Sequence, residues 1–166
     1  MELVDKLNNK YEPLNKVGER SEKILGEYNQ IVHVWIMNDK KEFLIQKRSL
    51  NKKVFPGMWS QTGGGVDAGE TISQGALRES KEELGIDISE DKIEFMLSFK
   101  RKYNFLNIML AKINVEINDL HIQKEEVSKV KWVDKDTLIK MHNDGELAPS
   151  LDIYFDMLLE LLDYPY

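Results

Sequence analysis

The clearest pattern along the chain is a series of apolar runs that predict β-strands. Residues 31–37 form a nearly continuous apolar run rich in β-branched side chains, which is typical of a buried strand. Turn-forming residues follow at 38–41, and residues 42–47 are expected to return as a second strand. The sequence therefore predicts a sheet, to which later apolar segments add strands at 93–99, 105–115 and 127–133.

Helical periodicity is strongest over residues 71–84, and Gly85 follows this segment as a C-terminal cap. One stripe of the helix, at about 100° per residue, carries Ala76, Leu77, Ser80 and Leu84. Shorter helices are expected at 138–141 and 151–162. Because strands and helices are mixed without strict alternation, the predicted fold class is α/β, with a mixed sheet flanked by helices.

Residues 1–27 are charged and weakly patterned, and they predict no more than a short strand at 3–4. The apolar stripe of the helix at 151–162 is expected to face the core. A homodimer formed through that stripe or through the N-terminal segment remains open.

Length, composition and charge narrow the class of protein. A chain of 166 residues, 42% hydrophobic and 31% charged, is expected to form a single domain over residues 1–166. No run approaches the roughly 18 apolar residues of a membrane span, and the N-terminus does not resemble a signal peptide. The chain has no cysteine, and its net charge of −6 argues against nucleic acid or anionic membranes as partners. We therefore expect a cytoplasmic protein.

Three carboxylates suggest chemistry on the central helix. Glu79, Glu82 and Glu83 stand at i, i+3 and i+4, so their side chains converge on one face. Their oxygens are the hard ligands that Mg²⁺ or Mn²⁺ prefers, although a solvated acidic face gives the same pattern. Two neighbours favour the metal site, because Arg78 adjoins the first carboxylate and Glu70 begins the helix.

These residues resemble the signature of the Nudix (MutT-like) hydrolases. In that family a Gly and a Glu precede an Arg-Glu-aliphatic-any-Glu-Glu-any-Gly-aliphatic segment at fixed spacing. One position departs, since Ser80 stands where the family has an aliphatic residue. Every other position of the box, residues 64–86, keeps its spacing, and the matching residues are Gly64, Glu70, Arg78, Glu79, Glu82, Glu83, Gly85 and Ile86.

The resemblance implies a Nudix fold, an α/β/α sandwich, and a Mg²⁺-dependent hydrolase for which Mn²⁺ can substitute. It implies Glu79 and Glu83 as principal metal ligands, Glu82 as a ligand or the general base, and the Gly63 carbonyl as a further ligand. It also implies that Arg78 holds these carboxylates in place. The structural positions of the box are Gly64, Glu70 and Gly85.

A further carboxylate often comes from outside the helix in this family. Glu126 lies six residues before Trp132, a spacing similar to that of several members, and Glu125 stands beside it. The resemblance makes Glu126 a candidate metal ligand. The alternative is that both are ordinary loop charges.

The segment 44–59 is similar to one branch of the superfamily, which includes isopentenyl-diphosphate isomerase. In that isomerase the residues matching Arg48 and Lys52 contact the diphosphate, so both are candidate substrate-binding residues. Arginine forms paired hydrogen bonds to phosphate and lysine adds a mobile charge. A solvated basic hairpin is the alternative. The isomerase needs a catalytic cysteine and metal-binding histidines, and this chain has neither at those positions, whereas His33 is expected to be a packed core residue.

The expected function is therefore Mg²⁺-dependent cleavage of the diphosphate linkage in a small molecule, either a nucleoside diphosphate derivative or a nucleotide. Two alternatives remain. One is an isomerase acting on isopentenyl diphosphate. The other is a module that binds a nucleotide without turnover.

Overall fold

A computed structural model describes residues 2–163 and shows a mixed seven-stranded sheet. The main path of the sheet is β5-β4-β3-β8-β7, while β6 pairs with β3 and β9 pairs with β4. Strands β3 and β8 are parallel and the other pairs are antiparallel, which confirms the mixed sheet. The strands are β3 (Asn29–Met37), β4 (Phe43–Arg48), β5 (Trp59–Ser60), β6 (Thr62–Gly65), β7 (Ile93–Lys100), β8 (Asn104–Lys112) and β9 (Val127–Val133).

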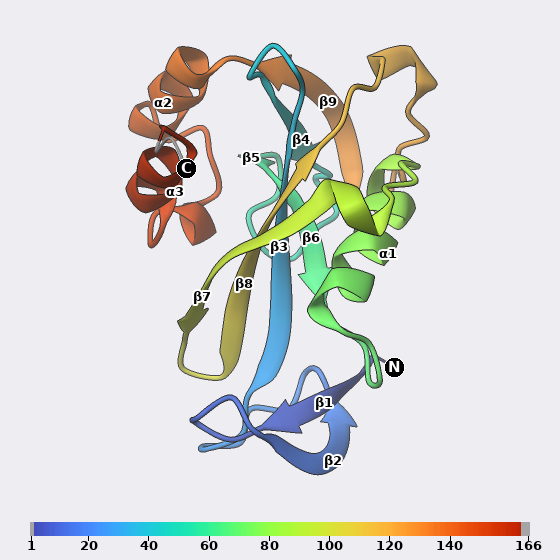
Figure 1. Ribbon diagram of the computed structural model, residues 1–166, viewed down its shortest axis with the longest axis vertical. Coiled ribbons are helices and arrows are strands. Elements are labelled where there is room, and N and C mark those ends of the chain that lie inside the picture. The colour runs from blue at the N-terminus through green and yellow to red at the C-terminus, as the bar shows by residue number, and fades with distance from the viewer. Residues whose placement is uncertain (1, 164–166) are drawn as a thin grey trace.

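Helices cover both faces of this sheet (Figure 1). Helix α1 (Ile72–Leu84) packs on the face to which β3 contributes Val32 and Val34. Helices α2 (Lys135–Asn143) and α3 (Phe155–Asp163) pack on the opposite face, against Trp35 of the same strand. Successive side chains of a strand point to opposite faces, so the continuous apolar run of β3 supplies both cores. The predicted α/β/α architecture is confirmed.

Helix α1 begins and ends where the sequence predicts. Thr71 caps its N-terminus, and its side chain accepts a hydrogen bond from the Gln74 amide in a complete capping box. Gly85 ends the helix in the left-handed conformation, with φ of 71°. Ser80 is fully buried, and its hydroxyl donates to the Ala76 carbonyl at 2.9 Å. The polar departure from the family pattern therefore leaves no unpaired hydroxyl in the core.

Two predicted elements are too long. The strand predicted at 105–115 ends at Lys112, because both of its partner strands end there: Met37 of β3 pairs with Lys112, and Ile93 of β7 pairs with Ala111. The helix predicted at 151–162 begins as a separate 3₁₀ turn, η3 (Pro149–Leu151), and α3 starts only at Phe155. Two other short 3₁₀ turns are present. The turn η1 (Glu90–Lys92) precedes β7, and η2 (Ile117–Asp119) follows β8.

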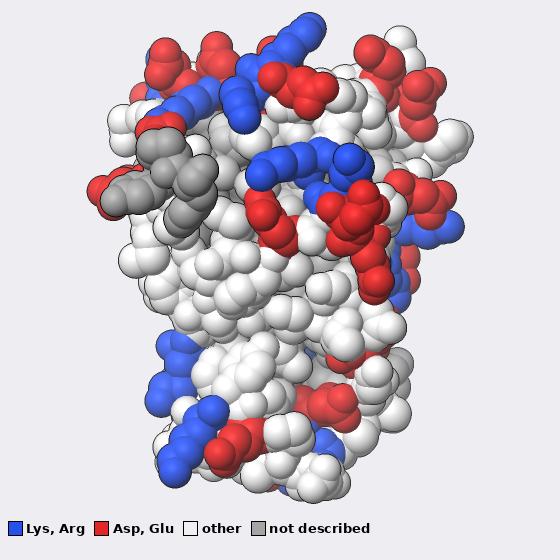
Figure 2. Space-filling model, in the orientation of Figure 1, with Lys and Arg blue, Asp and Glu red and all other residues white. Residues whose placement is uncertain are grey.

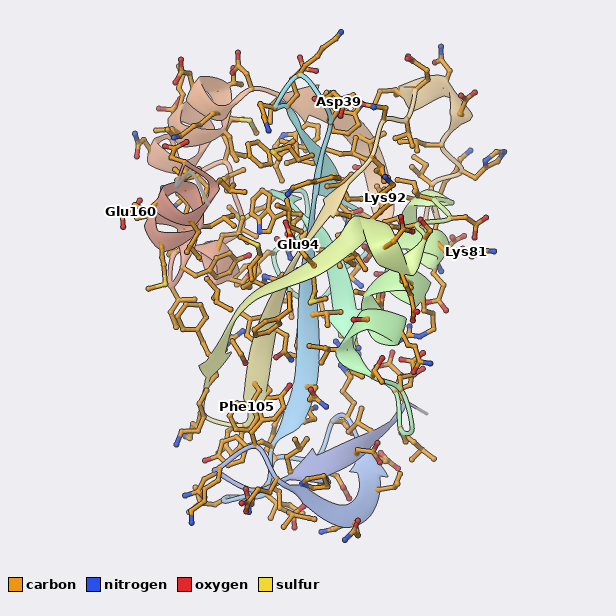
Figure 3. All side chains as sticks on the ribbon, in the orientation of Figure 1. Asp39, Lys81, Lys92, Glu94, Phe105 and Glu160 are labelled. Carbon is orange, nitrogen blue, oxygen red and sulfur yellow. The ribbon has the colours of Figure 1, made fainter. Side chains whose placement is uncertain are left out.

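A hairpin of β1 (Leu3–Leu7) and β2 (Pro13–Glu19) forms a separate two-stranded sheet at one end of the molecule (Figure 1). The sequence predicts only part of β1, because β2 is mostly exposed and has no alternating pattern. The Tyr11 ring meets the edge of Phe105, with ring centroids 4.6 Å apart. Phe105 is labelled in Figure 3, where it lies beside this hairpin. The contact attaches the hairpin to β8.

Charged side chains on the face shown in Figure 2 gather mostly in its upper part, and acidic and basic groups are interspersed there. One exposed pair joins Lys112 and Glu94 at 2.8 Å. This face therefore presents no large surface of a single charge. Among residues 2–163, no helix is both long enough and apolar enough to cross a membrane.

Candidate active site

A cleft of about 800 Å³ lies beside α1 and β6. Its walls come from distant parts of the chain: the β1–β2 hairpin, the loop after β4, and residues 123–126 before β9. Glu70 and Gly85 stand outside this lining. The predicted site residues that the cleft brings together are Arg48, Lys52, Gly63, Gly64, Arg78, Glu79, Glu82, Glu83 and Glu126.

Glu83 is the most deeply buried carboxylate of the site, with 6% of its surface exposed. One of its oxygens, Oε2, accepts hydrogen bonds from Thr62 Oγ1, from Gln46 Nε2 at 2.8 Å and from the Gly63 amide at 3.1 Å. These three donors fix the carboxylate and engage only one of its two oxygens. Burial raises the pKa of Glu83 above its usual range, although the three hydrogen bonds oppose this shift.

Glu79 lies directly over the β6 backbone, in the space that Gly64 leaves. A Cβ atom at position 64 would stand 2.3 Å from Glu79 Oε1, so any larger residue would displace this carboxylate. Burial raises the pKa of Glu79 to about 7, and the charge of Glu83 adds to the shift. Gly64 therefore leaves room for the Glu79 carboxylate, which gives a steric reason for glycine at this position of the box.

Arg78 connects the glutamates to the glycine-rich strand. Its guanidinium donates to both oxygens of Glu70 at 2.8 and 3.0 Å and to the Gly65 carbonyl at 2.8 Å. The same group donates to Glu79 at 2.9 Å and to Glu82 at 3.2 Å. The Glu70 hydrogen bond and the neighbouring carboxylates raise the pKa of Arg78, which stays charged at all relevant pH values. Arg78 therefore fixes the spacing of the carboxylates.

Basic side chains also line the cleft. Lys52 Nζ forms an ion pair with Glu126, and the Arg48 guanidinium donates to the Val54 carbonyl at 2.9 Å, which shapes the loop between them. Burial is the main cause of the raised pKa of Glu83, and the charge of Glu126 adds to it. Basic and acidic groups thus line one cavity.

The donor atoms of this cleft fit a divalent cation. Within residues 2–163, no three Asp, Glu or His side chains stand close enough together to chelate an ion as they are arranged. Arg78 binds one oxygen each of Glu79 and Glu82, and Lys52 binds one oxygen of Glu126. The acidic side chains nevertheless raise one another's pKa values, which a bound cation would reverse. Gln46 Oε1, next to Glu83, is also buried without a hydrogen-bond partner. Hard carboxylate and amide oxygens suit Mg²⁺ or Mn²⁺.

His33 lines the same cleft without titrating near neutral pH. Burial, together with the charges of Arg101 and Arg48, lowers the pKa of His33 to about 3. Its Nδ1 lies 2.8 Å from the Tyr154 hydroxyl, which also accepts a hydrogen bond from Trp35 Nε1 at 3.2 Å. His33 is therefore a hydrogen-bonded core residue, as the sequence predicts.

Thr62 and Gln46, which both bind Glu83, escape sequence reasoning. Gln46 carries one signal, because it is a polar residue that directly follows the three apolar residues at the start of β4. Thr62 directly precedes the glycine run and gives no local sign of its contact with α1.

Comparison with known families decides the identity of the fold. The family model of the NUDIX domain matches residues 27–152. The chain belongs to the Nudix family. It is 38% identical over 165 residues to an uncharacterized Nudix hydrolase from Listeria innocua, a match that covers 97% of this chain and 95% of the relative. It is also 28% identical to an isopentenyl-diphosphate Delta-isomerase from Klebsiella pneumoniae, over 63% of this chain and 60% of that enzyme.

Solved structures agree with the Nudix fold. DR0079 from Deinococcus radiodurans superposes with a TM-score of 0.72 at 21% identity, covering 89% of this chain and 92% of that one. The NUDIX domain of NrtR from Shewanella oneidensis, solved in complex with ADP ribose, gives a TM-score of 0.63 at 21% identity over 90% of this chain and 93% of that one. As a Nudix hydrolase, the chain is an enzyme that acts on pyrophosphate bonds. Nudix hydrolases generally use divalent metals.

Proposed function

We propose that this Nudix hydrolase cleaves the diphosphate linkage of a nucleoside diphosphate derivative, or of a nucleotide, in a reaction that depends on Mg²⁺. The observation that carries the proposal is that buried Glu83 and largely buried Glu79 line the same cleft as the cations Arg48 and Lys52. A diphosphate is anionic, so it needs positive charge between itself and the glutamates. The complex of NrtR with ADP ribose supports a small-molecule substrate of this class.

Each group has a place in this mechanism. Arg48 and Lys52 would bind the phosphoryl oxygens and orient the substrate along the cleft. Glu79, Glu82 and Glu83, with Glu126 and the Gly63 carbonyl, would hold Mg²⁺, which supplies positive charge where charge develops on the phosphoryl oxygens. Arg78 keeps the carboxylates at fixed spacing by the hydrogen bonds described above.

The attacking water needs a carboxylate that can orient it and take its proton. Glu82 is the most accessible carboxylate of the helix, with 54% of its side chain exposed, against 13% for Glu79. This access makes Glu82 our candidate for the general base. Its second role as a metal ligand remains an alternative.

A screen of substrates tests the proposal. Purified protein with Mg²⁺ is expected to hydrolyse at least one member of a panel of nucleoside diphosphate derivatives and nucleoside di- and triphosphates. Product identification by phosphorus NMR shows which phosphorus is attacked. Absence of any product with Mg²⁺ or Mn²⁺ would contradict the proposal. Ligand binding detected by calorimetry without any product would favour the non-catalytic module.

The isomerase alternative has a separate test. The match to the Klebsiella pneumoniae isomerase covers the segment that holds Arg48 and Lys52, but the chain has no cysteine to serve as the isomerase nucleophile. We expect no conversion of isopentenyl diphosphate to its isomer. Formation of the isomer at a rate above that of the hydrolase panel would replace the proposed reaction.

The pKa of Glu79 predicts how pH controls metal binding. Its pKa of about 7 lies above the ordinary 4.5, so between these values the folded metal-free protein binds more protons than the unfolded chain. The contribution of Glu79 to the free energy of unfolding therefore falls as the pH rises from 4.5 to about 7. A cation that binds the ionised carboxylate reverses the loss.

We accordingly expect saturating Mg²⁺ to raise the melting temperature more at pH 8 than at pH 5.5, as measured by thermal unfolding. Glu79→Gln is the matched control, because it removes the titrating group and should make the increment less dependent on pH. Equal increments at the two pH values in the unmodified protein would show that Glu79 does not bind the ion.

We further propose that the enzyme acts in the cytoplasm as a single domain on a free small molecule. Binding to nucleic acid is not expected for a chain of net charge −6. A homodimer stays a proposal, and sedimentation of the purified protein tests it.

A further inference from the structure

The β1–β2 hairpin lies outside the part of the chain that matches the NUDIX domain, yet it forms one wall of the cleft. The family match begins at residue 27, whereas Glu2 and Arg20 both line the cavity. These two residues form an ion pair, with Arg20 Nη1 2.7 Å from Glu2 Oε2. The hairpin therefore brings a charged group to the cleft from outside the residues that the family model matches.

Hydrogen bonds hold the β1–β2 hairpin in place beside the loop that connects β6 to α1. The Ala68 amide donates to the Leu3 carbonyl at 2.9 Å, and the Gly69 amide donates to Asp5 Oδ2 at 2.8 Å. The Arg20 amide itself donates to the Glu2 carbonyl at 2.9 Å. Because residues 68 and 69 connect β6 to α1, the position of Arg20 is tied to the same loop that sets the glutamates.

Two neighbouring glycines of β6 accommodate two different side chains. Gly64 pairs with Val32 and Gly65 pairs with Ile31, so the two open to opposite faces of the sheet. Glu79 fills the space over Gly64, on the α1 side. The Arg20 guanidinium fills the space over Gly65, where a Cβ atom would stand 2.9 Å from its Cζ. Among the described strands only β3 pairs with β6, so the other edge of β6 is open. The residues that line the cleft come from both faces of the sheet.

Arg20 and residues of β3 line the same part of the cleft. Ile31 pairs with Gly65 and His33 pairs with Gly63, so both point to the face on which Arg20 lies, and Arg48 also lines the cleft. The acidic neighbour of Arg20 is Glu2, whose side chain is 63% exposed and remains hydrated. An exposed ion pair of this kind contributes little to stability, so a phosphate group can replace Glu2 as the partner of Arg20 at small cost.

We propose that Arg20 is a substrate-binding residue, which holds the phosphoryl group of the diphosphate that lies farther from the glutamates. In this arrangement the diphosphate crosses the edge of β6, between Glu79 over Gly64 and Arg20 over Gly65. The inference rests on the proposed function, because it assigns a role to one half of the same cleft. It restricts the substrate to molecules with at least two phosphoryl groups.

Calorimetric titration with inorganic diphosphate in the presence of Mg²⁺ tests this role, once phosphorus NMR has verified that the diphosphate stays intact during the titration. Arg20→Gln is expected to raise the dissociation constant about tenfold, which corresponds to the loss of one charge-assisted hydrogen bond. Arg20→Lys keeps the charge and should recover part of that loss. For any substrate that the panel yields, Arg20→Gln should raise KM with little change in kcat, since it removes a contact remote from the glutamates.

Two control variants separate substrate binding from a structural role. Glu2→Gln breaks the same ion pair and is expected to leave the dissociation constant unchanged or to lower it. Lys16→Gln removes another exposed cation of the hairpin, which pairs with Glu27 at 2.7 Å outside the cleft, and should have no effect. Thermal unfolding verifies that each variant is folded.

Three results would overturn the inference: no measurable binding of diphosphate by the unmodified protein, a change below twofold in Arg20→Gln, or equal weakening in Glu2→Gln and Arg20→Gln. The last result would mean that the pair serves only to hold the hairpin. Binding that depends on Arg20 in a protein that hydrolyses no member of the panel would instead refute the proposed function and leave this inference standing.

Discussion

Replacing Glu83 with glutamine is expected to lower kcat on the order of a thousandfold while the protein stays folded. The amide is almost the same size as the carboxylate, and its oxygen can still accept from Thr62, Gln46 and the Gly63 amide. What disappears is the negative charge that would hold the divalent cation, and loss of one electrostatic group at a transition state costs about 10²–10³ in rate. Burial raises the pKa of Glu83, so removing its charge should not destabilise the protein.

Steady-state kinetics on the substrate found by screening, together with thermal unfolding, measure the two parts of this prediction. Glu94→Gln is the matched control, because it makes the same chemical change at an exposed position of β7 outside the cleft. Glu94 is labelled in Figure 3. Its kcat should equal that of the unmodified enzyme. Retention of more than a tenth of the activity in Glu83→Gln would show that Glu83 does not take part in the reaction.

Replacing Arg78 with glutamine is expected to reduce both stability and activity. The guanidinium binds Glu70, Glu79 and the Gly65 carbonyl, and glutamine can satisfy at most part of this set. Since hydrogen bonds to charged groups contribute about 1.5–3 kcal/mol, we expect the free energy of unfolding to fall by about 2 kcal/mol. The carboxylates would lose their fixed spacing, so kcat should fall about 100-fold.

Urea unfolding gives the stability term, and Lys81→Gln is its control on the same helix. Lys81 pairs with Asp87 at 2.7 Å, but both side chains are largely exposed, so this change should cost less than about 1 kcal/mol. If Arg78→Gln unfolds at the same urea concentration as the Lys81 variant, the hydrogen-bond network around Arg78 contributes nothing to the fold.

The parts of the molecule that the sequence predicts well are those with local causes. Helix α1 follows from its capping residue Thr71, its apolar stripe and Gly85, all of which lie within or beside the helix itself. The carboxylates Glu79, Glu82 and Glu83 share a face because of helical spacing alone, and the fixed positions around them identify the family. These features need no knowledge of the rest of the chain.

The parts that could not be predicted depend on contacts between distant segments. Strand β2 is mostly exposed, so its side chains carry no alternation that indicates a strand. The contact of Arg20 with Gly65 joins positions 45 residues apart, and Thr62 reaches Glu83 across 21 residues. The ends of β8 and α3 depend on where β3 stops and where η3 turns the chain, which are also tertiary effects.

One measurement tests the central claim most directly: phosphorus NMR of the products formed in ¹⁸O-labelled water by the unmodified enzyme and by Glu83→Gln, with and without Mg²⁺. The account predicts that the unmodified enzyme with Mg²⁺ places a single ¹⁸O atom on one product phosphate. It predicts no product when Mg²⁺ is removed and at most trace product from Glu83→Gln. Equal incorporation in the absence of divalent metal, or equal product from Glu83→Gln, would contradict a metal-dependent reaction at the α1 glutamates.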